Sequence, residues 1–192
     1  MKKSLVASGL MVLIGGFLAT SVIADSKNNT LARFQGGIGD IPVANVAGTA
    51  NSDGTFSAVT QNIVRGVAPA PAIWVISNLT ADVQVDGNIH VNGQGLLLGS
   101  SNAIGENANA SVFATLICED AAPFTQFSTN PAGVPLAANG NFQINDVLSP
   151  TPPADCPSPV LLIRVTANGT WFAAGIPNLG NQNNQGNQNN QN

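Results

Sequence analysis

Side chains suited to enzymatic chemistry are scarce in this sequence. It contains one histidine, His90, and only two of its ten acidic residues are glutamates. A serine-hydrolase triad would have to use His90, but the chain has no Gly-x-Ser-x-Gly motif to supply the nucleophile. The nearest segment, residues 99–102, reads Gly-Ser-Ser-Asn and matches that motif poorly. We therefore expect no catalytic residues and interpret His90 as an exposed strand residue without a role.

Carboxylate chemistry is also weakly supported. Glycoside hydrolysis needs two carboxylates held at a fixed separation, and the candidates are Glu106, Glu119 and Asp120. Glu119 and Asp120 are adjacent, so on a strand their side chains would point to opposite faces. In a loop the two could converge, but we interpret them as solvating residues that follow a buried strand.

Motifs for metals and cofactors are absent. Two cysteines and one histidine cannot complete a four-ligand zinc site without carboxylates, and no pair has zinc-site spacing. Residues 51–54 match part of a calcium loop, but the full pattern would run from Thr49 to Thr60 and lack both terminal carboxylates. We interpret them as a turn. The glycines within 36–39 precede no helical pattern that could hold a phosphate. We expect no metal ion and no cofactor.

Long apolar runs are missing beyond the first two dozen residues. Two lysines at positions 2 and 3 precede an apolar run over residues 5–18, and small residues lead up to Ala24. This layout predicts a secretory signal peptide over residues 1–24. The alternative is an uncleaved membrane anchor, but glycines interrupt the run and leave it shorter than a span of roughly 20 residues. We expect a secreted, periplasmic or cell-surface protein.

Charged residues make up only 8% of the chain, against about a quarter in typical soluble domains. After signal cleavage, the chain has ten acidic residues and only four basic ones, which are Lys27, Arg33, Arg65 and Arg164. So few scattered bases cannot neutralise a phosphate backbone or attract anionic lipid. The sequence therefore predicts neither nucleic-acid binding nor membrane binding by the mature protein.

The chain has two cysteines, Cys118 and Cys156. In an exported protein we expect them to form a disulfide, the alternative being two unpaired thiols. Cys156 lies in a segment, residues 149–159, that contains five prolines. Because proline has no backbone N–H, this segment should run extended over the surface. A disulfide would attach it to the strand that ends at Cys118.

From residue 34 onward, short apolar runs alternate with clusters of glycine, asparagine, aspartate and proline. This pattern is typical of all-β folds. We predict an antiparallel two-sheet sandwich, immunoglobulin-like or jelly-roll-like, of about seven to nine strands over residues 34–178. Residues 25–33 should form a flexible N-terminal arm. Residues 179–192, mainly asparagine and glutamine, should be disordered and could self-associate.

Several strands of this sandwich can be placed by their residues. The expected strands include 55–64, 73–76 and 95–98. Residues 111–118 are apolar on both faces and should form a central strand. Trp74 lies in the apolar strand over 73–76 and Trp171 in the apolar segment 170–173, so both should pack in the core. Stacking of either ring on a sugar is the alternative.

The clearest hairpin spans residues 81–91. A three-residue loop over 86–88 would pair Val85 with Ile89 and place the valines and isoleucine of both strands on one face. Asn88 would then adopt a left-handed conformation, which asparagine tolerates well.

The same register pairs His90 with Gln84 on the opposite, polar face. Two further hairpin turns are predicted at 168–169 and 139–140, each with the sequence Asn-Gly. After the second of these turns, Phe142 and Ile144 should face the core.

These observations predict a secreted, non-catalytic β-sandwich that acts as an extracellular surface, matrix or binding module. Its strand edges or its tail over 179–192 would contact further copies, another protein or a polysaccharide. The alternative hypothesis is a secreted hydrolase or small-ligand-binding protein whose site is assembled from loops near His90.

Overall fold

The computed structural model describes residues 29–178, which form strands, turns and loops without a helix. This part of the chain accordingly has no helix long and apolar enough to span a bilayer. The predicted signal peptide and Asn/Gln-rich tail lie outside the described residues. The strands are β1 (Thr30–Gly39), β2 (Val43–Ala50), β3 (Phe56–Gln61), β4 (Trp74–Val75), β5 (Asn78–Gln84), β6 (Asn88–Gln94), β7 (Leu97–Leu98), β8 (Ser111–Ile117), β9 (Phe127–Ser128), β10 (Val134–Pro135), β11 (Phe142–Val147), β12 (Val160–Val165) and β13 (Trp171–Pro177).

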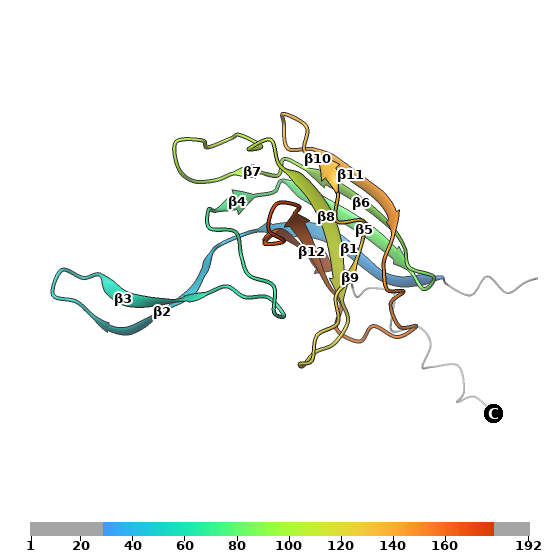
Figure 1. The fold of residues 1–192 in the computed structure, drawn as a ribbon, viewed down its shortest axis with the longest axis horizontal. Helices are drawn as coiled ribbons and strands as arrows, with labels where there is room; N and C mark the ends of the chain where they lie inside the picture. The colour runs from blue at the N-terminus through green and yellow to red at the C-terminus, as the bar shows by residue number, and fades with distance from the viewer. Residues whose placement is uncertain (1–28, 179–192) are drawn as a thin grey trace, which may run out of the picture.

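An antiparallel sheet of nine strands contains most of the described strand residues (Figure 1). Its order is β10-β8-β12-β13-β1-β5-β6-β11, with β9 paired to β8 outside this path. The sheet curves until its terminal strands, β10 and β11, approach each other, so it is nearly closed and barrel-like. The all-β, antiparallel prediction is confirmed, but this single wrapped sheet replaces the predicted pair of sheets. Alternating side chains indicate which face is buried, whereas backbone pairing between distant strands decides whether one sheet encloses its own core.

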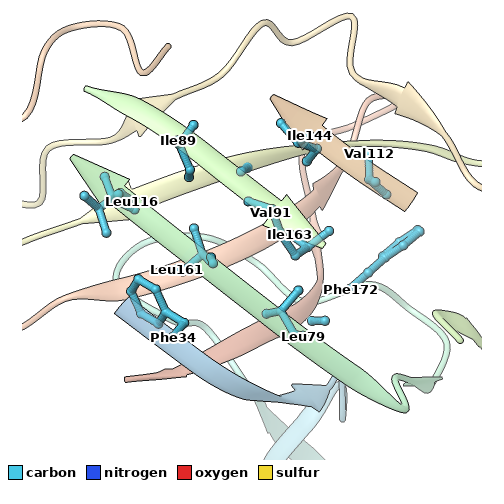
Figure 2. Packing of buried hydrophobic residues seen from close by; sticks show 14 of the residues in the cluster. Phe34, Leu79, Ile89, Val91, Val112, Leu116, Ile144, Leu161, Ile163 and Phe172 are labelled. Carbon is cyan, nitrogen blue, oxygen red and sulfur yellow. The ribbon is translucent and has the colours of Figure 1, made fainter. Parts of the chain in front are cut away.

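Apolar side chains from most strands of this sheet meet in its interior (Figure 2). Leu79, Val91, Leu116, Leu161 and Ile163 are completely buried there. Their burial follows from strand alternation, because every second side chain points to the enclosed face. This core holds the sheet together and supports the elements that project from it.

Strand β8 is buried on both faces, as predicted for residues 111–118. Its inner side chains join the main core. On its outer side a second cluster covers β8 and β12, formed by Val67, Ile117, Leu162 and Trp171. Val67 belongs to the segment that follows β3, so that segment shields the outer face of the sheet.

Strands β5 and β6 form the predicted hairpin with a shifted loop. Val83 pairs with Ile89, so the three loop residues are 85–87 and the predicted loop over 86–88 is wrong by one position. Gly87 has a φ of +88° and takes the left-handed position. Glycine adopts this conformation without a steric penalty, which explains why the turn is placed there.

Because the loop is shifted, the predictions for three residues were wrong. Asn88 begins β6 and is not the left-handed residue of the turn. Val85, predicted to face the core, is exposed. His90 pairs with Asp82 and not with Gln84.

The other two predicted turns differ in outcome. The turn at 168–169 joins β12 and β13 as a hairpin, as predicted. The turn at 139–140 forms, and Phe142 and Ile144 are buried as predicted. However, β10 pairs with β8, so this turn does not close a two-stranded ladder with β11.

The first strand begins inside the segment predicted to be flexible. β1 starts at Thr30, and Leu31 and Ala32 are buried, so the predicted arm over 25–33 is wrong from residue 30 onward. Strand β1 pairs with β13 on one side and with β5 on the other, in the middle of the sheet. The short, mixed polar and apolar sequence of residues 25–33 does not reveal pairing with strands as distant as β5 and β13.

Cys118 and Cys156 form the predicted disulfide, with sulfur atoms 2.06 Å apart. It attaches the proline-rich segment to the end of β8. Arg65 reinforces the same place, because its guanidinium donates hydrogen bonds to the main-chain oxygens of Glu119 and Ser158 and to the Ser158 hydroxyl. Arg65 thereby attaches the chain after β3 to the two segments that the disulfide joins.

Candidate functional site

Strands β2 and β3 form a two-stranded ribbon that projects from the nine-stranded sheet (Figure 1). We call residues 41–63 the β2–β3 ribbon. Its turn is made by residues 51–54, with Gly54 at a φ of +82° and the Asn51 N–H bonded to the Thr55 carbonyl oxygen at 2.7 Å. The predicted strand over 55–64 therefore exists as β3, but it lies outside the core. Within the described residues, β2 and β3 pair only with each other.

The ribbon carries apolar side chains that the fold does not bury. Five of them are between 41% and 57% exposed: Ile41, Val43, Phe56, Val59 and Ile63. Its one charged residue is Asp53. Hydrogen bonds from the side chain and backbone of Thr55 lower the pKa of that carboxyl group. Apolar surface that is left unburied and nearly free of charge is typical of a contact surface.

Asp40 lies at the root of the ribbon. Its backbone N–H donates to the Phe172 carbonyl oxygen at 2.9 Å, and its own carbonyl oxygen accepts from the Trp74 N–H at 3.2 Å. The side chain is fully buried, and its carboxyl oxygens have no hydrogen-bond partner among the described residues. Burial raises the pKa of Asp40 to about 7. The nearby backbone N–H of Ala70 lowers it only in part, because that N–H donates to the Trp171 carbonyl oxygen at 3.2 Å.

A pocket of about 430 Å³ lies between β4, residues 108–111 and the β12–β13 turn. Trp74 and Phe172 form part of its wall. Their rings are stacked, with centroids 3.8 Å apart and planes inclined by 15°. Both tryptophans are buried, which confirms the core prediction; the Trp171 indole N–H donates to the Asn62 carbonyl oxygen at 3.1 Å.

His90 lies in a second concavity, an open groove of about 650 Å³ on the outer surface of β5, β6 and β11. It is exposed, as predicted, and its Nδ1 contacts the side-chain oxygen of Asn145. Asp82 lines the same groove and pairs with Arg33 at 2.7 Å. The described residues that line this groove include no serine, threonine or cysteine, the nucleophiles that the alternative hydrolase hypothesis would need beside His90.

The remaining predicted candidates are not brought together. The Glu119 carboxylate accepts a hydrogen bond from the Thr125 backbone N–H, and Asp120 is exposed beside it. Interactions with backbone groups and Thr125 lower the pKa of Glu119. Within residues 29–178, no group of three or more histidine, cysteine or acidic side chains is arranged to hold a metal ion.

Comparisons with protein families, curated proteins and solved structures gave no match for this chain. Sequence reasoning had missed the two features that distinguish the structure, the β2–β3 ribbon and buried Asp40. Val43, Phe56 and Val59 belong to short apolar segments similar in composition to the core strands, so their exposure was not visible in the sequence. One usable signal was the low density of charge over residues 41–63.

Proposed function

We propose that this protein is an exported, non-catalytic β-protein that works as a building or binding module of an extracellular surface or matrix. In this proposal the β2–β3 ribbon is the contact element. The single observation that carries it is the exposed, nearly uncharged apolar surface of a ribbon that pairs with no other described strand.

The ribbon suits an association role for a physical reason. Among residues 29–178, each of its strands has one edge that pairs with no other strand, where backbone N–H and C=O groups can accept a strand from another chain. Burying exposed side chains such as Phe56 and Val59 would contribute roughly 25 cal/mol per Å² of apolar surface removed from water. A second copy of the chain is the first partner to test.

Export is supported by two features. The layout of residues 1–24 is that of a secretory signal. The Cys118–Cys156 disulfide suits an oxidising compartment. We therefore propose that the mature chain begins at Asp25 and functions in the periplasm, at the cell surface or in the medium.

A non-catalytic role is favoured by the chemistry of the concavities. The groove contains His90 and carboxylates but no hydroxyl or thiol nucleophile among its described residues. The pocket beside Trp74 contains serine and threonine hydroxyls but no titratable side chain among its described lining. A third concavity, of about 480 Å³, contains serine and threonine hydroxyls together with Asp146, but the Asp146 carboxylate accepts from the backbone N–H groups of Asn130 and Val147 and from no hydroxyl among the described residues. Nucleophilic catalysis needs both kinds of group within hydrogen-bond reach of each other.

The deciding experiment is light scattering on oxidised protein over a range of concentrations. Residues 25–192 should assemble as concentration rises. The double variant Phe56→Ser and Val59→Ser should shift this equilibrium about tenfold toward the monomer, because it removes exposed apolar surface without touching the core. Ile104→Ser is the matched control, since Ile104 is an exposed isoleucine outside the ribbon.

A second comparison separates the ribbon from the tail. Residues 25–178 should assemble like the full mature chain if the ribbon is responsible. Loss of assembly on removing the tail alone would contradict the ribbon's role. Equal assembly of the ribbon variant and the Ile104→Ser control would contradict it as well.

A further inference from the structure

We propose that the pocket beside Trp74 and Phe172 binds an uncharged, mainly apolar small molecule that carries one or two hydrogen-bonding groups. This inference is independent of the ribbon. It rests on the size of the pocket, its rigid wall, its polar rim and its lack of charge.

The size and wall of the pocket suit a ligand. At about 430 Å³ it falls within the range of small-molecule sites, roughly 300–1,000 Å³. The ring stack of Trp74 on Phe172 belongs to the main core, and Ala70 beside it is almost completely buried. Figure 2 shows Phe172 at the margin of the labelled core residues. A wall anchored in this way is already formed, so a ligand would not have to order it.

Small side chains explain why the space is open. Alanines line the pocket at positions 70, 72, 108, 110 and 167, and they come from three separate segments of the chain. Larger apolar residues at any of these positions would extend into the space. The short side chains of these alanines therefore leave the pocket unfilled.

The rim supplies hydrogen-bonding groups that the fold leaves available. Asn109, Ser111 and Thr166 line the pocket, and within residues 29–178 no hydrogen bond engages their side chains. The side-chain oxygen of Asn168 accepts from the backbone and hydroxyl of Thr170, which holds that amide in place with its NH₂ group unused.

The pocket discriminates by charge. No lysine, arginine, histidine, aspartate or glutamate is present among its described lining residues. An ionic ligand would lose its hydration without gaining a counter-charge, which costs far more than desolvating a neutral molecule. A ligand with an apolar body and hydroxyl, carbonyl or N–H groups fits the wall and rim together.

Two dyes with the same ring skeleton can test this. N-phenyl-1-naphthylamine is neutral and carries one N–H, whereas 8-anilinonaphthalene-1-sulfonate adds an anionic sulfonate. The chain has two tryptophans, of which Trp74 lines the pocket and Trp171 does not. In a Trp171→Phe variant, emission therefore reports on Trp74 alone.

We expect saturable quenching of Trp74 by the neutral dye and an affinity about tenfold weaker for the sulfonate. Ala72→Leu should weaken binding of the neutral dye about tenfold by filling the pocket. Ala167→Leu fills it from another segment and serves if the first variant does not fold. Ala121→Leu, an exposed alanine outside the pocket, is the matched control and should bind like the parent.

The opposite results would overturn the proposal. These are no saturable quenching, equal affinity for the two dyes, or unchanged binding in both folded filling variants. Tighter dye binding after Phe56→Ser and Val59→Ser would instead assign the pocket to the ribbon of a second copy. Unchanged dye binding in that double variant is the result expected here.

Discussion

Asp40 places a carboxyl group at the root of the ribbon, where the described residues offer it no hydrogen-bond partner. In the folded protein its pKa is about 7, compared with 3.8 for a free aspartate side chain. Between these values the folded chain holds a proton that the unfolded chain releases. The contribution of Asp40 to stability is therefore lost as pH rises from about 4 to about 7 and is constant above that range.

The Asp40→Asn variant tests this directly. Asparagine has the same shape and never ionises, so urea unfolding at pH 8 should give a free energy higher than that of the parent by on the order of 2–4 kcal/mol. Near pH 4 the two proteins should differ little, because both then carry a neutral side chain. Asp155→Asn, at an exposed aspartate, is the control. A uniform loss of stability at both pH values would show that the carboxyl group makes a structural contact instead.

At the level of elements, the β5–β6 turn decides where one strand ends and the next begins. With Gly87 at a φ of +88°, a side chain at this position strains the backbone. Gly87→Ala should lower the free energy of unfolding by about 1–2 kcal/mol, and Asn88→Ala by less than about 0.5 kcal/mol. Thermal or urea unfolding measures both. The reverse ranking would place the turn over 86–88.

Alternation predicted the faces of these strands well, because Val83, Ile89 and Val91 are buried in either register of the hairpin. The turn itself was not predictable by the same means, since moving it by one residue leaves those faces unchanged. The choice between Gly87 and Asn88 depends on a steric difference, which the apolar pattern does not contain.

The ribbon shows a second limit of pattern reading. Phe56 and Val59 have the composition of a core strand, yet their strand has no sheet to pack on. Whether an apolar strand is buried depends on what the rest of the chain brings to it. The residues involved are far apart in sequence, so the contact element could not be separated from the core beforehand.

At the level of the whole molecule, the disulfide was predicted correctly because two cysteines in a chain with the layout of an export signal leave few alternatives. The nearly closed sheet was not predicted, since it requires β1 to pair with both β5 and β13. The pocket also could not be predicted from the sequence, because the alanines that line it lie in three separate segments. Local sequence predicts which face of a strand is buried and where turns occur. The curvature of the sheet depends on pairing between strands that are far apart in sequence.

Removing the disulfide should destabilise the whole domain. The bridge joins residues 38 positions apart, so loop-closure entropy predicts a loss of about 4 kcal/mol in the double variant Cys118→Ala and Cys156→Ala. Urea unfolding of the parent with and without reductant should give a difference of similar size. The double variant is its own control, because reductant should not change its stability. Equal stability of the parent in both conditions would show that Arg65 and the core suffice.

The position of β1 has a consequence for how the protein folds. The first strand of the described chain is flanked on one side by β13, the last. The centre of the sheet therefore cannot be completed until β13 is present, and a chain with such distant contacts folds slowly. If the protein is exported as proposed, this delay is useful, because translocation requires an unfolded chain. The strand order would keep the polypeptide unfolded until β13 has crossed the membrane.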